Sequence, residues 1–159
     1  SKTFQEAMAM AKGRVLNKFK TMHRTATDVV AFVNVLDVYE YLGTSAVINE
    51  QSEFGFNYIK NFMGYKTVFL LAETEIARGK VIATPADNIV LYYVNPTNSD
   101  WARAGFRLTT DSNTGIVGVN TRPDYGTFVT VITAVMGMTL FAEYIDGIAV
   151  ETITPGESV

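Results

Sequence analysis

Two pairs of closely spaced carboxylates are the strongest candidates for catalysis in this chain: Glu73 with Glu75, and Glu143 with Asp146. Two carboxyl groups about 5 Å apart, or about 6.5 to 9.5 Å apart, are sufficient for glycoside hydrolysis. On extended backbone Glu73 and Glu75 would share one face of a strand. Both precede a turn, however, and Asp146-Gly147 is itself a common turn pair. A carboxylate-dependent hydrolase is one open interpretation, and solvated acids at turns are the other.

The residue types exclude most other catalytic and cofactor chemistry. The chain has no cysteine, which removes thiolate catalysis, disulfides and Cys-ligated metal sites. His23 is the single histidine and lies beside Arg24, so we expect it on the surface at a helix end. Neither glycine-rich phosphate-binding pattern occurs, and Asp111-Ser112-Asn113 is too sparse for a calcium site. We expect no enzyme activity, no cofactor, no metal ion and no small-molecule substrate.

Basic residues are concentrated at the start of the chain. Residues 1–24 contain six lysines and arginines and one acid, so this segment carries a net charge of +5 and the remainder −8. A basic segment can face nucleic acid, and it can equally be the solvated face of a helix. The residues that would face nucleic acid are Lys12, Arg14, Lys18, Lys20 and Arg24.

The elements that must position these groups begin with a helix. Phe4, Met8, Ala11, Val15 and Phe19 recur every three or four residues, which is typical of the apolar stripe of an amphipathic helix. This stripe predicts one helix of about five turns.

A buried strand and a short helix are expected next. Residues 29–33 form a continuous apolar run, typical of a strand buried on both faces. Residues 38–42 are predicted to be helical, with Asp37 as the N-terminal cap, Glu40 reaching back to it, and Gly43 as the left-handed stop.

The middle and end of the chain favour strands, with one exception. Phe54, Tyr58, Ile59 and Phe62 repeat at helical spacing and predict a helix that ends at Gly64. Most of the remainder has the β-branched content and the turn residues of a sheet. The strands are predicted at residues 65–72, 81–84, 89–94, 106–110, 115–121 and 148–153.

The stretch from Tyr125 to Ala142 contains no charged residue in 18 positions and is long enough to span a membrane. Threonines recur through it and Gly137 interrupts it. The β-branched run 129–133 favours a strand, while residues 136–144 fit a strand or a helix. We therefore expect no membrane association.

Composition indicates one folded domain with a rather neutral surface. The 159 residues are 48% hydrophobic and 18% charged, below the ~25% charged residues usual in soluble domains. A neutral surface suits a protein that binds neighbours. No repeat or linker separates segments of the chain, so residues 1–159 are expected to form a single α+β domain.

Several strings of residues resemble a known family. Residues 83–96 (ATPADNIVLYYVNP) and 136–150 (MGMTLFAEYIDGIAV) occur in an order typical of that family. Residues 28–37, followed by YEYLG at 39–43 and FGF at 54–56, match the same order. Together they resemble the C-terminal part of the major capsid proteins of tailed bacteriophages of Gram-positive hosts. The resemblance covers nearly the whole chain and consists of packing and turn motifs.

The resemblance implies the coat fold shared by tailed-phage capsids, herpesvirus capsid floors and encapsulin shells. This chain would be the axial domain, a central β-sheet flanked by helices with a returning C-terminal strand. In that family, axial domains meet around the five-fold and quasi-six-fold axes of an icosahedral shell that encloses double-stranded DNA. The residues before Phe4 are too few for the family's N-terminal arm, extended hairpin and spine helix, so we expect these to be missing. The implied location is the virion capsid, assembled in the host cytoplasm; an encapsulin-like shell with cargo is the related alternative.

Copies of this chain are therefore the expected partners. Rotational rings use heterologous contacts, in which one patch meets a different patch on the next copy. We expect the contacts in loops 44–53, 95–105 and 111–126, with Trp101 either anchoring a partner or folded back onto its own sheet. The residues predicted for subunit contacts are Trp101, Asn98, Asp100, Arg103, Asn113, Tyr125, Glu50 and Glu53.

Overall fold

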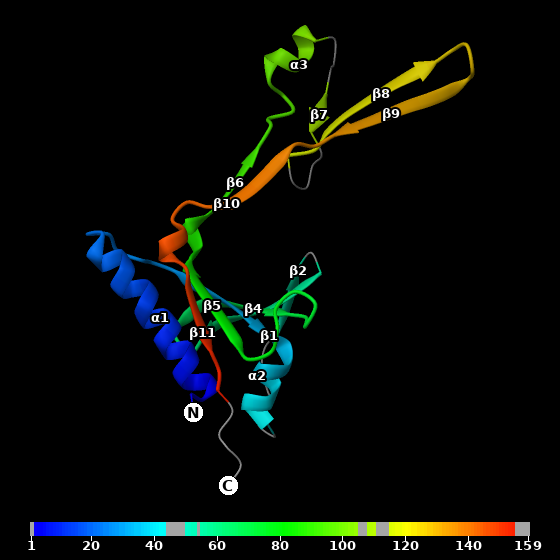
Figure 1. Cartoon of the computed structure of the whole chain (residues 1–159). Helices are drawn as coiled ribbons and strands as arrows, with labels where there is room; N and C mark the ends of the chain where they lie inside the picture. The colour runs from blue at the N-terminus through cyan, green and yellow to red at the C-terminus, as the bar shows by residue number, and fades with distance from the viewer. Residues whose placement is uncertain (1, 44–49, 54, 105–107, 111–114, 155–159) are drawn as a thin grey trace. The chain divides into compact units, whose positions relative to one another are not determined.

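The computed structural model describes residues 2–43, 50–53, 55–104, 108–110 and 115–154 (Figure 1). Contacts group the chain into two compact units. Unit 1 consists of residues 1–89 and 142–159, and unit 2 consists of residues 90–141. The single domain expected from the sequence stays a prediction, because two contact units can belong to one folding unit.

Unit 1 is built on a mixed six-stranded sheet with the strand order β11-β5-β1-β4-β3-β2. Strand β1 is central: it runs parallel to β4 and antiparallel to β5, and Ala31 is paired with Val68 on one side and Ala83 on the other. The α+β class expected from the sequence is confirmed. The elements of unit 1 are α1 (Phe4–Thr21), β1 (Val29–Asn34), α2 (Val35–Leu42), β2 (Gln51–Glu53), β3 (Phe56–Phe62), β4 (Tyr65–Leu71), β5 (Lys80–Pro85), η2 (Ala86–Asn88), η3 (Ile145–Gly147) and β11 (Ala149–Thr152).

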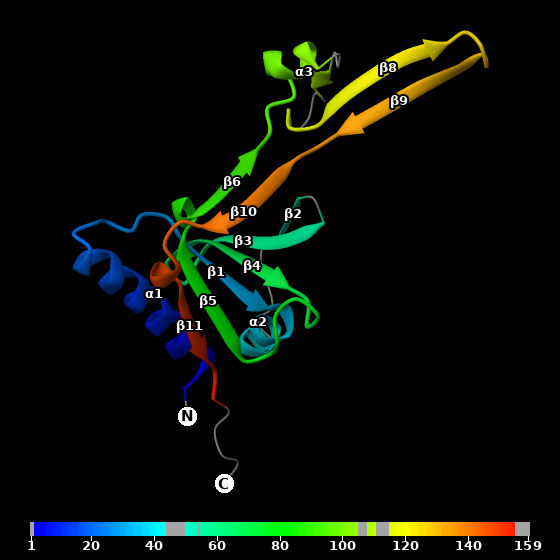
Figure 2. The same cartoon turned by 45° about the horizontal axis from the view of Figure 1, so that its top comes forward.

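Helix α1 covers one side of this sheet, lying along β11 and β5 (Figures 1 and 2). A capping box starts the helix, with the Thr3 hydroxyl accepting from the Glu6 amide and the Glu6 carboxylate accepting from the Thr3 amide. The predicted apolar stripe is confirmed, since all five of its side chains are buried. The Tyr65 hydroxyl donates to the Met8 carbonyl over 2.6 Å, and burial raises the pKa of this tyrosine. The core of unit 1 thus lies between α1 and the sheet.

The helix predicted from Phe54 to Phe62 is wrong, because most of this segment is strand β3. Strand β3 pairs antiparallel with β4, and Ile59 is buried opposite Val68. The turn that joins the two strands has left-handed backbone at Met63 and Gly64. The spacing of apolar residues alone does not distinguish a helix from a strand in a short segment. Here the side-chain contacts between β3 and β4 stabilise the strand. Phe54 itself lies outside the described residues.

The predicted cap of α2 is also wrong. The helix begins earlier, at Val35, and the Asn34 side chain caps it by accepting from the Leu36 amide. Asp37 is instead a buried residue of the first turn, where its carboxylate accepts from the Gly79 amide over 2.6 Å. Gly43 ends the helix with a positive φ, as predicted.

Among its described residues, unit 2 contains two small β-sheets and one short helix. A two-stranded sheet pairs β6 with β10, and a three-stranded sheet has the order β7-β8-β9. The uncharged stretch 125–142 contains β9 and β10, and no helix in the described part of the chain is long and apolar enough to cross a membrane. The elements are β6 (Ile89–Tyr93), α3 (Ser99–Arg103), β7 (Thr109–Thr110), β8 (Gly118–Asp124), β9 (Val129–Val135) and β10 (Met138–Ala142).

Candidate assembly surface

Unit 2 contributes no side chain to the hydrophobic core found among the described residues. All members of that core lie before residue 90 or after residue 141. By contrast, twelve large apolar side chains of unit 2 are exposed. These are Leu91, Tyr92, Tyr93, Val94, Tyr125, Phe128, Val129, Ile132, Met136, Met138, Leu140 and Phe141. Contiguous exposed apolar surface is typical of an interaction site.

The ribbon formed by β6 and β10 carries eight of these side chains, if the residues next to its strands are included. Backbone pairing continues just beyond the strands, where the Val94 amide donates to the Gly137 carbonyl over 2.8 Å. On one side of the ribbon the rings of Tyr92 and Phe141 are stacked, with centroids 5.0 Å apart. This stacking fixes which side chains share a face.

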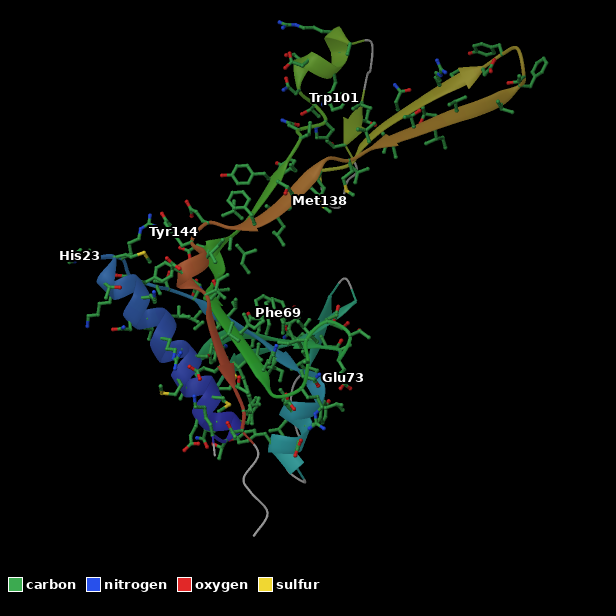
Figure 3. All side chains as sticks on the ribbon, in the orientation of Figure 1. His23, Phe69, Glu73, Trp101, Met138 and Tyr144 are labelled. Carbon is green, nitrogen blue, oxygen red and sulfur yellow. The ribbon has the colours of Figure 1, made fainter. Side chains whose placement is uncertain are left out.

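The predicted anchor, Trp101, lies in the short helix α3. The Asn98 side chain caps α3 by accepting from the Asp100 amide. Trp101 is half-buried, and its indole Nε1 donates to the carbonyl of Asn95 over 3.2 Å (Figure 3). Arg103 lies 3.6 Å from the Asp100 carboxylate on the exposed side of the helix. Trp101 therefore fixes its own loop, and its contact with another copy stays a prediction.

The turn between β8 and β9, residues 125–128, presents two aromatic side chains to solvent. Tyr125 is 80% exposed and Phe128 is 94% exposed. Phe128 has a φ of +55°, a conformation that is unfavourable for a bulky residue. The turn is held from within, because the Asp124 carboxylate accepts from the Gly126 amide over 2.9 Å. Hydrogen bonding from Thr127 and Gly126 lowers the pKa of Asp124.

Two of the predicted contact residues lie in unit 1. The Glu50 carboxylate accepts from the Tyr39 hydroxyl, which raises the pKa of Tyr39, and it lies 3.4 Å from the Asn57 amide nitrogen. Glu53 is paired through its backbone with Phe56 at the edge strand β2. Asn113 lies outside the described residues. Contacts of these three residues with another copy stay predictions.

Three of the five basic residues proposed to face DNA have partners within unit 1. Lys12 donates to the Gly64 carbonyl, Arg14 lies 2.5 Å from the Glu151 carboxylate, and the Arg24 guanidinium lies 4.6 Å from the centre of the Tyr144 ring. Lys18 and Lys20 are exposed in the last turn of α1, where cations stabilise a helix. These two lysines are the most available for an anionic partner.

The carboxylates considered for hydrolysis are exposed. Glu73 and Glu75 lie in the turn after β4, and the Glu75 carboxylate accepts from the Ala72 amide (Figure 3). Glu143 and Asp146 are exposed near η3. His23 lies at the exposed end of α1, as expected. Among the described residues, no group of three His, Asp or Glu side chains could hold a metal ion.

A hollow of about 640 Å³ in unit 1 brings together Asp37 and Glu40, which the sequence indicated only as capping residues. Both carboxylates are bound by Arg78: Asp37 accepts from its Nε over 3.1 Å and Glu40 accepts from its Nη2. The bond from Asp37 raises the pKa of Arg78. This arrangement ties α2 to the turn before β5, and both carboxylates are held by the same guanidinium.

The exposed side chains of β6 and β10 are the residues that sequence reasoning missed. The available signal was apolar residues at both odd and even positions in 90–94 and 138–141, without charges. No protein-family model matches the chain, and no curated protein is similar to it in sequence.

Proposed function

We propose that this chain is a capsid subunit whose function is to bind copies of itself. It would form the axial domain of a phage coat protein and contribute to the pentamers and hexamers of an icosahedral shell around double-stranded DNA. The main support for this proposal is the exposed apolar surface of unit 2, none of whose side chains belongs to the described hydrophobic core.

Two further features support a structural role over a catalytic one. The candidate carboxylates are either in solvent-exposed turns or bound to Arg78. The resemblance of residues 83–96 and 136–150 to tailed-phage capsid proteins points in the same direction. Neighbouring subunits would cover the surface that the isolated chain leaves open.

Electron microscopy of the purified gene product that contains this chain tests the proposal. We expect closed particles of uniform size when the protein is concentrated. Particles that enclose DNA in infected cells support a virion capsid, whereas particles that enclose a protein cargo indicate a nanocompartment. A gene product that stays monomeric at every concentration contradicts both.

Replacing Phe128 by glycine is expected to weaken assembly without destabilising the subunit. Glycine adopts a φ of +55° without strain, so the free energy of unfolding should stay equal or rise by up to about 1 kcal/mol. Loss of an aromatic anchor at an interface weakens binding by about 2 kcal/mol or more. Light scattering against concentration measures assembly, and urea unfolding measures stability. Unchanged assembly would show that the turn is not a contact.

The exposed lysines of α1 make a prediction about DNA. If Lys18 and Lys20 contact phosphates, the variant Lys18→Gln/Lys20→Gln should reduce the slope of log K against log salt by roughly 2, because each phosphate contact contributes about 0.9. Arg14→Gln is the control, since Arg14 is paired with Glu151. Filter binding of duplex DNA at several salt concentrations measures the slope. An equal slope for both variants would contradict contact through these lysines.

A further inference from the structure

The ribbon of β6 and β10 has apolar side chains on both of its faces. Side chains alternate along a strand, so Leu91 and Tyr93 lie on the face opposite Tyr92. On β10, Met138 and Leu140 likewise lie opposite Phe141. Because Tyr92 stacks on Phe141, the two strands can be combined into two faces. Face A consists of Leu91, Tyr93, Met138 and Leu140, and face B consists of Tyr92, Thr139 and Phe141.

Both faces are open to solvent. Leu140 is 65% exposed on face A and Tyr92 is 56% exposed on face B. Met138 extends from β10 in Figure 3. A two-stranded ribbon is at best marginally stable in water without packing against something else. Strands with apolar residues at consecutive positions are typical of sheets that are buried on both sides.

The surface is large enough for a specific interface. The eight exposed apolar side chains of the ribbon and its flanks present on the order of 1,000 Å² of accessible surface over the two faces together. One contact between face A of one copy and face B of the next would therefore bury about 1,000 Å² in total, which is at the lower bound for a specific protein interface. This amount fits a stable protein contact better than a small ligand.

Charge favours a second copy of this chain as the partner. Residues 90–141 contain three arginines and three aspartates, so this segment has no net charge, and residues 125–142 contain no charge at all. Such a surface neither attracts a polyanion nor repels its own copy. Nucleic acid is therefore disfavoured at the ribbon, and a like surface is favoured.

We propose that ribbons of successive copies stack, with face A of one copy packed on face B of the next. This rests on the proposed self-assembly and names the surface that carries it. A two-fold dimer would bury face A on face A and leave face B in water. Only a heterologous contact, repeated around a ring, covers both faces of every ribbon with the same interaction.

Thiol cross-linking distinguishes these arrangements, because the natural chain contains no cysteine. Thr139→Cys places a thiol on face B, and Leu140→Cys places one on face A at the next position of the same strand. A bismaleimide about 10 Å long matches the spacing of stacked sheets. In assembled gene product, we expect cross-linked dimers when the two variants are mixed and at least tenfold fewer when either is used alone. The double variant should give a ladder of cross-linked rings.

Each other result overturns the proposal in a recognisable way. Efficient cross-linking of Leu140→Cys alone indicates a two-fold contact through face A. Particles that form normally but give no cross-link in the mixture contradict ribbon stacking and leave self-assembly standing. A gene product that never assembles contradicts the self-assembly and the stacking together.

A charged substitution supplies a second measurement. Leu140→Asp should weaken assembly by roughly 30-fold or more, the loss expected for an interface hot spot. Ile145→Asp is the matched control in unit 1, since Ile145 is 78% exposed and lies outside the ribbon. The helical circular dichroism of both variants should match that of the wild type, because the described core contains no residue of 90–141. Assembly that is equally weakened in both variants, or unchanged by Leu140→Asp, contradicts the proposal.

Discussion

Replacing Asn88 by alanine is expected to lower the free energy of unfolding by about 2 to 3 kcal/mol, which is a large fraction of the stability of a small domain. Asn88 is buried at the end of η2 and joins two segments that are distant in sequence. Its side-chain amide donates to the Thr84 hydroxyl and to the Tyr144 carbonyl, each over 3.0 Å. Its side-chain oxygen accepts from the Tyr144 amide over 2.7 Å.

The lower free energy of unfolding arises mainly at the Tyr144 amide, because Asn88→Ala removes the side-chain oxygen to which this amide donates. The Tyr144 carbonyl still accepts a hydrogen bond from the Gly147 amide. The expected decrease in the free energy of unfolding is therefore smaller than it would be if all three polar groups bonded to Asn88 were left without a partner. Urea unfolding monitored by circular dichroism measures the change. Hydrogen exchange should also show faster exchange at the amides of Glu143 and Tyr144.

Asp87→Ala is the matched control for this prediction, because Asp87 is the exposed neighbour in the same short helix. A surface substitution of this kind should change stability by no more than about 0.5 kcal/mol. If Asn88→Ala also costs less than about 1 kcal/mol, the hydrogen bonds between η2 and Tyr144 do not hold these segments together.

Elements with a strong period or a continuous apolar run could be predicted from the sequence. The stripe of α1 and the run of β1 specify burial by themselves, and both are confirmed. The segment 54–62 could not be assigned, because its helical spacing is overridden by pairing with β4. The cap at Asp37 was equally plausible by residue type, but Arg78 and Gly79 bind its carboxylate. Contacts between residues this far apart in the chain cannot be predicted from the local spacing of residue types.

The candidate surface was only partly predictable for the same reason. Strands β6 and β10 lie more than 40 residues apart in the chain, so their pairing, and hence faces A and B, became visible only in the fold. The sequence did indicate a neutral surface and an uncharged stretch at 125–142. An alternation of apolar and polar residues shows which face of a strand is buried. When both faces are apolar, the sequence contains no such alternation and does not show which residues are exposed.

Replacing Glu151 by glutamine is expected to destabilise unit 1 by about 2 kcal/mol. The Glu151 side chain on β11 is 4% exposed and forms ion pairs with Lys2 and Arg14. Lys2 Nζ donates to its Oε2 over 2.5 Å, and Arg14 Nε lies 2.5 Å from its Oε1. Among the described residues, none makes an aligned hydrogen bond to Oε1, so the contact with Arg14 is chiefly a charge interaction. Glutamine would leave this buried position without the charge that both cations face.

The destabilisation by Glu151→Gln should stay below the ~3 to 5 kcal/mol that results from breaking a fully buried ion pair, because Arg14 is 59% exposed and can be hydrated. Arg14→Gln alone should cost no more than about 1 kcal/mol, and it should cost nearly nothing in the Glu151→Gln background. Urea unfolding of the two single variants and the double variant measures this coupling, with Glu143→Gln as the exposed carboxylate control. Additive losses would show that Glu151 does not bind Arg14. Non-additive losses would show that charge contacts fasten the edge strand β11 to α1, in addition to the apolar stripe.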